Sequence, residues 1–274
     1  MSAVAQQWIA ITRAVSPAIA HCELTHLDRQ PIDLMAARAQ HHAYQEALRA
    51  LGCEVVSLPA DPALPDSVFV EDTAVVFDEI AVITRPGAPS RRPEIVTTAV
   101  ALRSYRPLVR IAPPGSMDGG DVLRVGRTVY VGLTARTNQA AIDQLKAALT
   151  PHDYVVGAVP VHGCLHLKSA ASQVAADMIL CNPRWVDPAA FAPLHVLEVD
   201  SAEPYAANGL LIDTQVVYPT TFPATRRRLK ERRITVTPVD ISELQKAEGA
   251  VTCCSLVFGA APHPSPGRAA MLQQ

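Results

Sequence analysis

Hydrophobic and polar positions along the chain alternate in short blocks, and the order of these blocks repeats. Residues 74–84 hold two apolar runs on either side of Asp78-Glu79, a pattern typical of two strands joined by a turn. We expect a helix near residues 93–105 and then an apolar strand at 108–112. The first recognisable unit is therefore strand, strand, helix, strand.

The same order returns three more times. In the second unit Thr137 is a plausible N-cap for a helix whose apolar residues share one face. In the third unit the helical pattern is weaker, because the segment contains Pro188 and Pro193, which disrupt a helix. The expected strands are 121–125, 129–132 and 154–159 in the second unit, 167–174, 178–181 and 196–199 in the third, and 209–212, 216–218 and 234–237 in the fourth, whose helix covers 224–232.

The last apolar segment, predicted as a strand at 251–258, has nothing helical after it. Its missing partners stand at the other end of the chain: a strand at 8–12, an amphipathic helix between Leu34 and Leu51, and a strand at 54–58. Gly52 stands where a C-cap glycine belongs. The fifth unit is therefore assembled from both ends of the chain.

Five such units closed into a ring predict an α/β fold, a five-bladed α/β propeller of ββαβ repeats with pseudo-fivefold symmetry. We assign the whole chain, residues 1–274, to this one domain. A doubly wound sheet would also mix strands and helices. It would not explain why strands come in pairs before each helix, and the sequence has no G-x-G-x-x-G fingerprint.

Composition and charge narrow the classes of function. The chain is 49% hydrophobic and 18% charged, as expected for a globular protein, and its net charge of −2 favours neither nucleic acid nor a membrane as a partner. The basic stretch 226–233 is expected to be the solvated face of a helix, since no aromatic residues interleave it. Six cysteines without zinc-ribbon spacing or a secretion signal indicate free thiols and a cytoplasmic protein.

The candidate chemistry lies just before the first strand of each unit. These positions hold Glu71-Asp72, Asp118, His166, Asn208 and Cys253, and they recur at intervals of 42–48 residues. Because equivalent positions of a closed array face the same axis, we expect these side chains to meet in one pocket.

This combination of side chains suits the chemistry of a guanidinium group. A cysteine becomes a nucleophile when a nearby cation favours its thiolate, and a histidine can serve as general acid and then general base. Buried acids need a cation between them, and a planar guanidinium presents paired N–H donors that match carboxylates. The pattern favours a cysteine-dependent enzyme with a cationic substrate.

Each residue also has a simpler explanation when it is taken alone. Cys253 could be a small buried hydrophobic residue, and His166 could be an ordinary core or surface histidine. Asp118 and Asp66 could be turn residues. The pair Glu71-Asp72 is harder to dismiss, because its neighbours are apolar.

Long motifs in the chain resemble those of the dimethylarginine dimethylaminohydrolases, a family of the amidinotransferase or pentein superfamily. The resemblance covers nearly the whole chain. It rests on LPDSVFVEDTAVV (64–76), ITRPGAPSRR (83–92), MDGGDVL (117–123), VYVGLTARTNQ (129–139), LHLKSAAS (165–172), ANGLLI (207–212) and VTCCSLVF (251–258).

The resemblance implies specific roles for the residues of these motifs. Cys253, the cysteine of the family's Cys-x-Ser pattern, would be the nucleophile, His166 the acid and base, and Asp118 the residue that orients and charges His166. The implied substrate-binding residues are Asp66, Glu71 and Asp72, which engage the substrate, Arg91 and Arg136, which hold its α-carboxylate, Leu24 on a lid loop near 21–26, and Ala247, whose main-chain carbonyl meets the α-amine.

The implied activity is hydrolysis of asymmetric dimethylarginine or monomethylarginine to citrulline and dimethylamine or methylamine, through a covalent thiouronium on Cys253. The resemblance implies a place in arginine metabolism and nitric oxide regulation. No organic cofactor or metal is expected, and zinc would bind only as an inhibitor at the active-site thiol. The implied partner is a small guanidino amino acid, and a homodimer is suggested by analogy alone.

Two other functions stay open. An arginine deiminase, or another guanidine-modifying pentein, would use the same cysteine, histidine and acids. A protein of a different class, a non-catalytic propeller that binds a cationic ligand or a partner protein, would have no use for the nucleophile. Dimethylarginine and arginine compared as substrates would separate a deiminase from a dimethylarginine hydrolase, and the intact set of Cys253, His166 and Asp118 speaks against a non-catalytic propeller.

Overall fold

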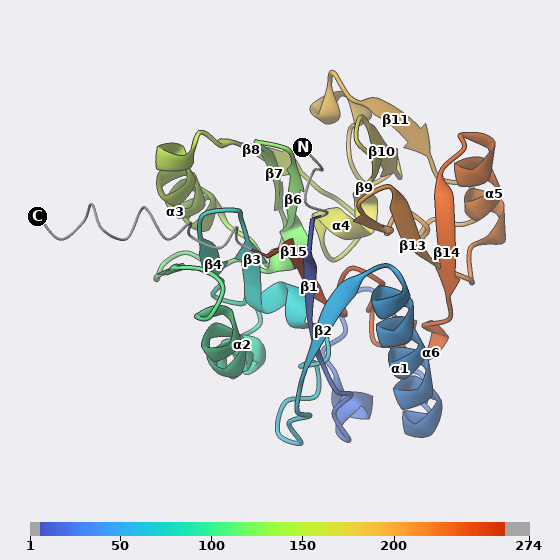
Figure 1. Ribbon diagram of the computed structural model, residues 1–274, viewed down its shortest axis with the longest axis horizontal. Helices are drawn as coiled ribbons and strands as arrows, with labels where there is room; N and C mark the ends of the chain where they lie inside the picture. The colour runs from blue at the N-terminus through green and yellow to red at the C-terminus, as the bar shows by residue number, and fades with distance from the viewer. Residues whose placement is uncertain (1–5, 261–274) are drawn as a thin grey trace, which may run out of the picture.

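The computed structural model describes residues 6–260, whose strands form five three-stranded sheets arranged in a ring (Figure 1). In each sheet the middle strand pairs antiparallel with one neighbour and parallel with the other. The five sheets are listed here with the strands of each in spatial order. They are β15 (Leu256–Gly259), β1 (Trp8–Arg13) and β2 (Cys53–Leu58); β3 (Ala74–Val76), β4 (Ala81–Ile83) and β5 (Leu108–Arg110); β6 (Val122–Val125), β7 (Thr128–Leu133) and β8 (Val155–Pro160); β9 (Ala171–Ala175), β10 (Met178–Cys181) and β11 (His195–Glu198); β12 (Leu210–Ile212), β13 (Gln215–Pro219) and β14 (Thr235–Val239).

A helical connection links the middle strand of each sheet to its parallel neighbour, as a parallel pair requires. The helices lie on the outside of the ring (Figure 1). They are α1 (Leu34–Ala50), α2 (Ile95–Leu102), α3 (Gln139–Leu149), the short 3-10 helix η6 (Pro188–Phe191) and α5 (Pro223–Glu231). The predicted propeller of ββαβ units is confirmed, and β15 pairs with β1, so one blade combines both ends of the chain.

Helix α1 forms where the sequence predicts an amphipathic helix. The side chain of Asp33 accepts hydrogen bonds from the main chain at Met35 and Ala36, which satisfies two free N–H groups of the helix start. The helix buries the side chains at three- and four-residue steps, Ala37, His41, Tyr44 and Leu48. Gly52 has a φ of +86°, so the predicted C-cap glycine is confirmed.

The hydrophobic core lies between neighbouring blades as well as beneath each helix. One cluster joins the blade made by both chain ends to the next blade through Ile9, Ile83, Leu102 and Phe258. Burying a side chain of this size stabilises the fold by about 1.5–3 kcal/mol. Such clusters fix the position of each blade relative to its neighbours. They therefore also position the segments that precede the first strand of each blade, near the axis of the ring.

Three local predictions are wrong. The N-cap of α3 is Asn138, whose side chain accepts from the main chain at Ala141, while the hydroxyl of Thr137 binds Asp121 instead. Residues 167–170 form the short helix α4 (Leu167–Ala170) rather than the start of a strand. The segment predicted as a strand at 251–258 pairs only from Leu256, since residues 251–254 form a turn in which the main-chain N–H of Thr252 donates to the side chain of Asn208.

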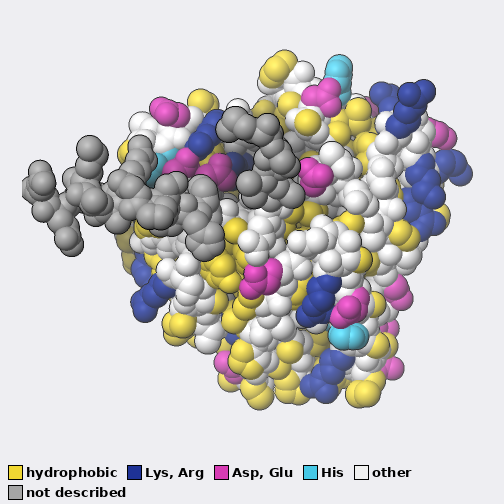
Figure 2. Space-filling model, viewed as in Figure 1, with side chains coloured by type: hydrophobic (Ala, Val, Ile, Leu, Met, Phe, Trp, Pro, Cys, Tyr) yellow, Lys and Arg dark blue, Asp and Glu magenta, His cyan; other side chains and the backbone are white. Residues whose placement is uncertain are grey.

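The basic stretch behaves as predicted. Lys and Arg side chains gather over α5 at the right of Figure 2, and Arg227, Lys230, Arg232 and Arg233 are exposed. Arg228 instead lies along the neighbouring turn, where it pairs with Asp200. Within residues 6–260, no helix combines the length and the apolar character needed to cross a membrane.

Candidate active site

The segments that precede the first strand of each blade meet at the centre of the ring. Asp72 lies in the 3-10 turn η2 (Val70–Thr73), Asp118 stands just before η4 (Gly119–Asp121), and His166 is the N-cap of α4. Asp118 contacts His166 from outside, whereas Asp72, His166 and the turn that carries Cys253 line a small cavity. Its lining residues are Glu23, Asp66, Phe69, Asp72, Arg91, Arg136, Leu165, His166, Ala247, Glu248, Gly249 and Cys253.

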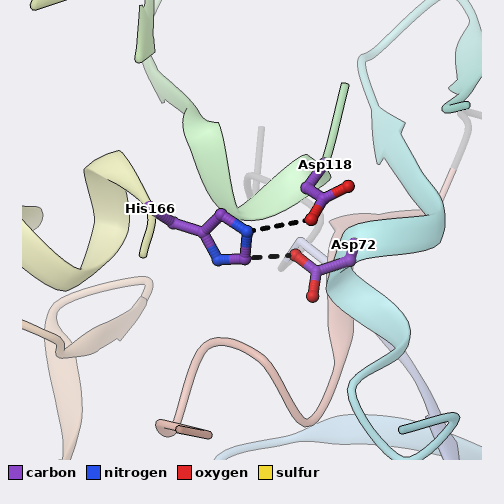
Figure 3. Close-up of side chains that lie close together, drawn as sticks. All are labelled: Asp72, Asp118 and His166. Atoms are coloured by element: carbon purple, nitrogen blue, oxygen red, sulfur yellow. Dashed lines mark hydrogen bonds and ion pairs between the residues drawn. The ribbon is translucent and has the colours of Figure 1, made fainter. Parts of the chain in front are cut away.

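His166 lies between two carboxylates (Figure 3). Its Nε2 atom is 3.0 Å from Oδ2 of Asp118, and its Nδ1 atom is 3.8 Å from Oδ1 of Asp72. All three side chains are almost completely buried. Gly120 allows this packing, because a Cβ atom there would come within 2.6 Å of Nδ1 of His166.

The two carboxylates determine the charge of the histidine. Burial on its own lowers the pKa of His166, but the charge of Asp72 and the hydrogen bond to Asp118 outweigh it and raise the pKa from 6.5 to about 9. Burial likewise opposes the ionisation of Asp72, yet His166 and Arg91 lower its pKa to about 2. At neutral pH the site therefore holds an imidazolium between two carboxylates, ready to donate a proton.

Asp121 helps to position His166, although it was not among the residues predicted from the sequence. Its Oδ1 atom accepts a hydrogen bond from the main chain of Leu167, which fixes the start of the helix that carries His166, and Oδ2 accepts from Thr134 and Thr137. Burial raises the pKa of Asp121 to about 6. Its place as the second acid of the MDGGD motif was the available signal.

Cys253 is the most accessible of the six cysteines, all of which lie in the described range and none of which forms a disulfide. Burial in this pocket and the charges of Glu71 and Asp72 raise the pKa of its thiol well above the usual 9. The thiol is therefore neutral at rest. A cation placed between Cys253 and the carboxylates would remove this penalty and favour the thiolate.

Glu71 lies beside the cavity, but its carboxylate points away from it. Oε1 is 2.6 Å from Nζ of Lys168, and Oε2 accepts a 2.7 Å hydrogen bond from Thr252. Asn208 completes this group by exchanging two hydrogen bonds with Thr252. Of the predicted pair, the structure thus brings only Asp72 to the cavity, while Glu71 braces the turn of Cys253, whose carbonyl accepts from the Glu71 main chain.

Two arginines line the cavity, and they differ in how many of their N–H groups are bonded to the protein. Among residues 6–260, Nη1 of Arg136 has no hydrogen-bond partner and lies 3.5 Å from Oδ2 of Asp118, while Nη2 donates to Thr25. Arg91 is fully engaged with protein groups, including a 2.6 Å contact between its Nη1 atom and Asp72. Arg136 is therefore the arginine whose donors are available for an anionic group.

The lid loop, predicted near residues 21–26, covers residues 22–28 in the structure and closes one side of the cavity. The carboxylate of Asp66 accepts hydrogen bonds from the main chain at Glu23. The carboxylate of Glu248 accepts from three consecutive N–H groups, those of residues 25, 26 and 27, at 2.5–3.0 Å. Ala247 lines the cavity as predicted, but from the lid it is Glu23, not Leu24, that does so.

One metal-like arrangement exists among the described residues. Asp72, Asp118 and His166 each offer a ligand atom within 4.8 Å of the others. These are the same atoms that form the ion pairs around the imidazolium. Because Nε2 of His166 is already bonded to Asp118, a metal ion would have to displace this hydrogen bond and the proton.

The ring of five sheets is the pentein fold. The N-terminal domain of ArgZ, described as an arginine dihydrolase of cyanobacteria, superposes with a TM-score of 0.77 at 15% identity over 92% of this chain and 98% of that domain. Fold and site together define the class of protein, a five-bladed α/β propeller with a cysteine beside a histidine–carboxylate pair at its centre.

Closer relatives identify the family. The family model described as N,N dimethylarginine dimethylhydrolase, eukaryotic, matches residues 26–181. The N(G),N(G)-dimethylarginine dimethylaminohydrolase of Streptomyces coelicolor is 40% identical over 90% of this chain and 95% of its own, and that of Pseudomonas aeruginosa is 35% identical over 82% and 90%. The chain belongs to the dimethylarginine dimethylaminohydrolase family.

Solved structures of dimethylarginine dimethylaminohydrolases, the first of them from Pseudomonas aeruginosa, agree with this assignment. A cysteine-to-serine variant in complex with citrulline superposes with a TM-score of 0.87 at 33% identity, over 92% of this chain and 99% of that one. A histidine-to-glycine variant described as an adduct with S-methyl-L-thiocitrulline superposes with a TM-score of 0.86 over the same share of this chain.

Proposed function

We propose that this protein hydrolyses the methylated guanidinium of asymmetric dimethylarginine or monomethylarginine, with citrulline and dimethylamine or methylamine as products. The observation that carries the proposal is that Cys253 lines one cavity with the imidazolium of His166 and two acids, Asp66 and Asp72. The family relatives with this activity in their names support the same reaction.

The proposed reaction begins with binding. The substrate guanidinium enters between Cys253 and Asp72, and its charge offsets the carboxylates that keep the thiol protonated. The thiol then loses its proton to solvent. Arg136, with its unsatisfied Nη1 atom, binds the α-carboxylate at the other end of the substrate. Fixing both ends of the substrate positions the central carbon for attack.

In the first chemical step, the thiolate of Cys253 attacks the central guanidinium carbon. His166, protonated at neutral pH, transfers its proton to the dimethylamino nitrogen, and the C–N bond breaks. Neutral dimethylamine leaves, and a cationic thiouronium remains on the sulfur. Asp72 stabilises this cation.

In the second step, His166 acts as a base. Now neutral, it takes a proton from water while the oxygen attacks the same carbon, and collapse of the adduct breaks the C–S bond, restores Cys253 and yields the ureido product. Apart from water, the proposed steps use only side chains of this chain. Because the product lacks the cationic guanidinium, the acidic pocket binds it less strongly and favours its release.

The test is incubation with asymmetric dimethylarginine and simultaneous detection of citrulline and dimethylamine. Arginine is assayed in parallel, and a preference for arginine with release of ammonia would assign the chain to the deiminases instead. Cys253→Ser should fold as wild type and lose turnover. The matched control is Cys53→Ser, which alters a thiol outside the cavity and should keep activity. Appreciable turnover by the Cys253 variant would refute the mechanism.

A further inference from the structure

The guanidinium of Arg91 is shared between two buried carboxylates. One edge forms a bidentate pair with Glu94, with Nε to Oε1 at 3.1 Å and Nη2 to Oε2 at 2.9 Å. The Nη1 atom is 2.6 Å from Oδ2 of Asp72. The carbonyls of Asp66 and Phe69 also accept from Nη2, so the guanidinium has a fixed orientation.

Glu94 belongs to the 3-10 helix η3 (Pro89–Glu94), three residues after Arg91, and it does not line the cavity. Its side chain is 98% buried. Burial raises the pKa of Glu94, an effect that the charge of Arg91 offsets in part. A carboxylate buried in this way, outside the cavity, is costly unless its cation stays in place.

The other end of this chain of contacts reaches the reacting groups. Oδ1 of Asp72 accepts a 3.0 Å hydrogen bond from the main chain of Gly120 and faces Nδ1 of His166. Glu94, Arg91, Asp72 and His166 therefore form one line from the core to the cavity. A change in the charge at Glu94 alters how strongly Arg91 neutralises Asp72.

We propose that Glu94 is a positioning residue, which binds the Nε edge of Arg91 and neutralises part of the charge of its guanidinium. Arg91 therefore neutralises Asp72 only in part, and Asp72 keeps enough negative charge to bind the substrate guanidinium. The inference rests on the proposed function and adds a residue to it.

The variant Glu94→Gln tests this role. The amide keeps the shape but not the charge, so Arg91 pairs with Asp72 alone and competes with the substrate for it. We expect KM for dimethylarginine to rise about tenfold, equivalent to about 1.4 kcal/mol, with a smaller change in kcat. Glu94→Asp keeps the charge with a longer contact, so its KM should lie between those of wild type and Glu94→Gln.

A pH profile separates this role from a merely structural one. His166 faces Asp72, Asp118 and Asp121 and shares the cavity with Arg136 and Cys253. When Arg91 neutralises Asp72 more fully, the imidazolium loses part of its stabilisation, so the alkaline limb of kcat should move to lower pH in Glu94→Gln. A general loss of packing would lower activity without moving this limb.

The matched control is Glu46→Gln, which removes the same charge from an exposed pair with Arg49 at the same three-residue spacing and should leave KM unchanged. An unchanged KM and alkaline limb in Glu94→Gln, with an active wild type, would overturn the inference while leaving the proposed function intact. A wild type inactive on dimethylarginine would refute the proposed function itself. If Glu94→Gln does not fold, Glu94→Asp carries the test, and its KM equal to that of wild type would overturn the inference.

Discussion

Replacing Asp118 by asparagine removes one of the two carboxylates that keep His166 protonated. Asp118 is completely buried, its Oδ2 atom is 3.0 Å from Nε2 of His166, and its Oδ1 atom accepts from the main chain of Gly87 at 2.8 Å. Asparagine has nearly the same shape, so the contact with Gly87 can persist. The charge that stabilises the imidazolium is lost.

The size of the effect follows from the geometry. A hydrogen bond to a charged group contributes about 1.5–3 kcal/mol, and one pKa unit corresponds to about 1.4 kcal/mol. The variant should therefore lower the pKa of His166 by about one to two units from its value of about 9. Because the wild-type pKa lies above the ordinary 6.5, protonated His166 also stabilises the fold below pH 6.5, and this contribution is lost as the pH rises through about 9.

The assay is kcat for citrulline formation from pH 6 to 10. Wild type should lose activity only near the pKa of His166, whereas Asp118→Asn should lose it one to two pH units earlier, by roughly the shift derived above. Asp143→Asn, which removes an exposed carboxylate from α3, serves as the control and should follow wild type. If the alkaline limb of Asp118→Asn coincides with that of wild type, Asp118 does not set the charge of His166.

Three further variants probe stability and the lid. Buried His41 has its pKa lowered by desolvation to about 4, so the unfolded chain takes up its proton first and stability falls between about pH 6.5 and 4. His41→Gln should abolish up to about 3 kcal/mol of this loss in urea unfolding at pH 7 and 4.5, whereas exposed His42→Gln should not. Lys168→Met leaves the buried carboxylate of Glu71 without its cation and should destabilise by about 3 kcal/mol; a double variant with Glu71→Gln that is no more stable would contradict this. Glu248→Gln should speed amide hydrogen exchange in the lid loop, because a neutral oxygen binds N–H groups less strongly than a carboxylate. Unchanged exchange would show that Glu248 does not hold the loop in place.

The repeat of the fold could be predicted from the sequence because it depends on local periodicity. Alternating and helical patterns mark strands and helices within short windows, and their repeated order predicted the ring and the blade shared by both chain ends. The near-constant spacing of Asp72, Asp118, His166, Asn208 and Cys253 then predicted a common pocket, since equivalent positions in a closed ring face the same axis. The motif resemblance added the lining residues Asp66, Arg136 and Ala247.

Only the tertiary structure decided where adjacent side chains point. Glu71 and Asp72 are neighbours in the sequence, but the tight turn of η2 sends them to opposite sides, and the partners that hold Glu71, Lys168 and Thr252, are 97 and 181 residues away. The pairing of Arg91 with Asp72 is equally invisible in the sequence. Spacing predicts the position of a backbone segment, whereas the direction and charge of a side chain depend on burial and on partners that only folding brings together.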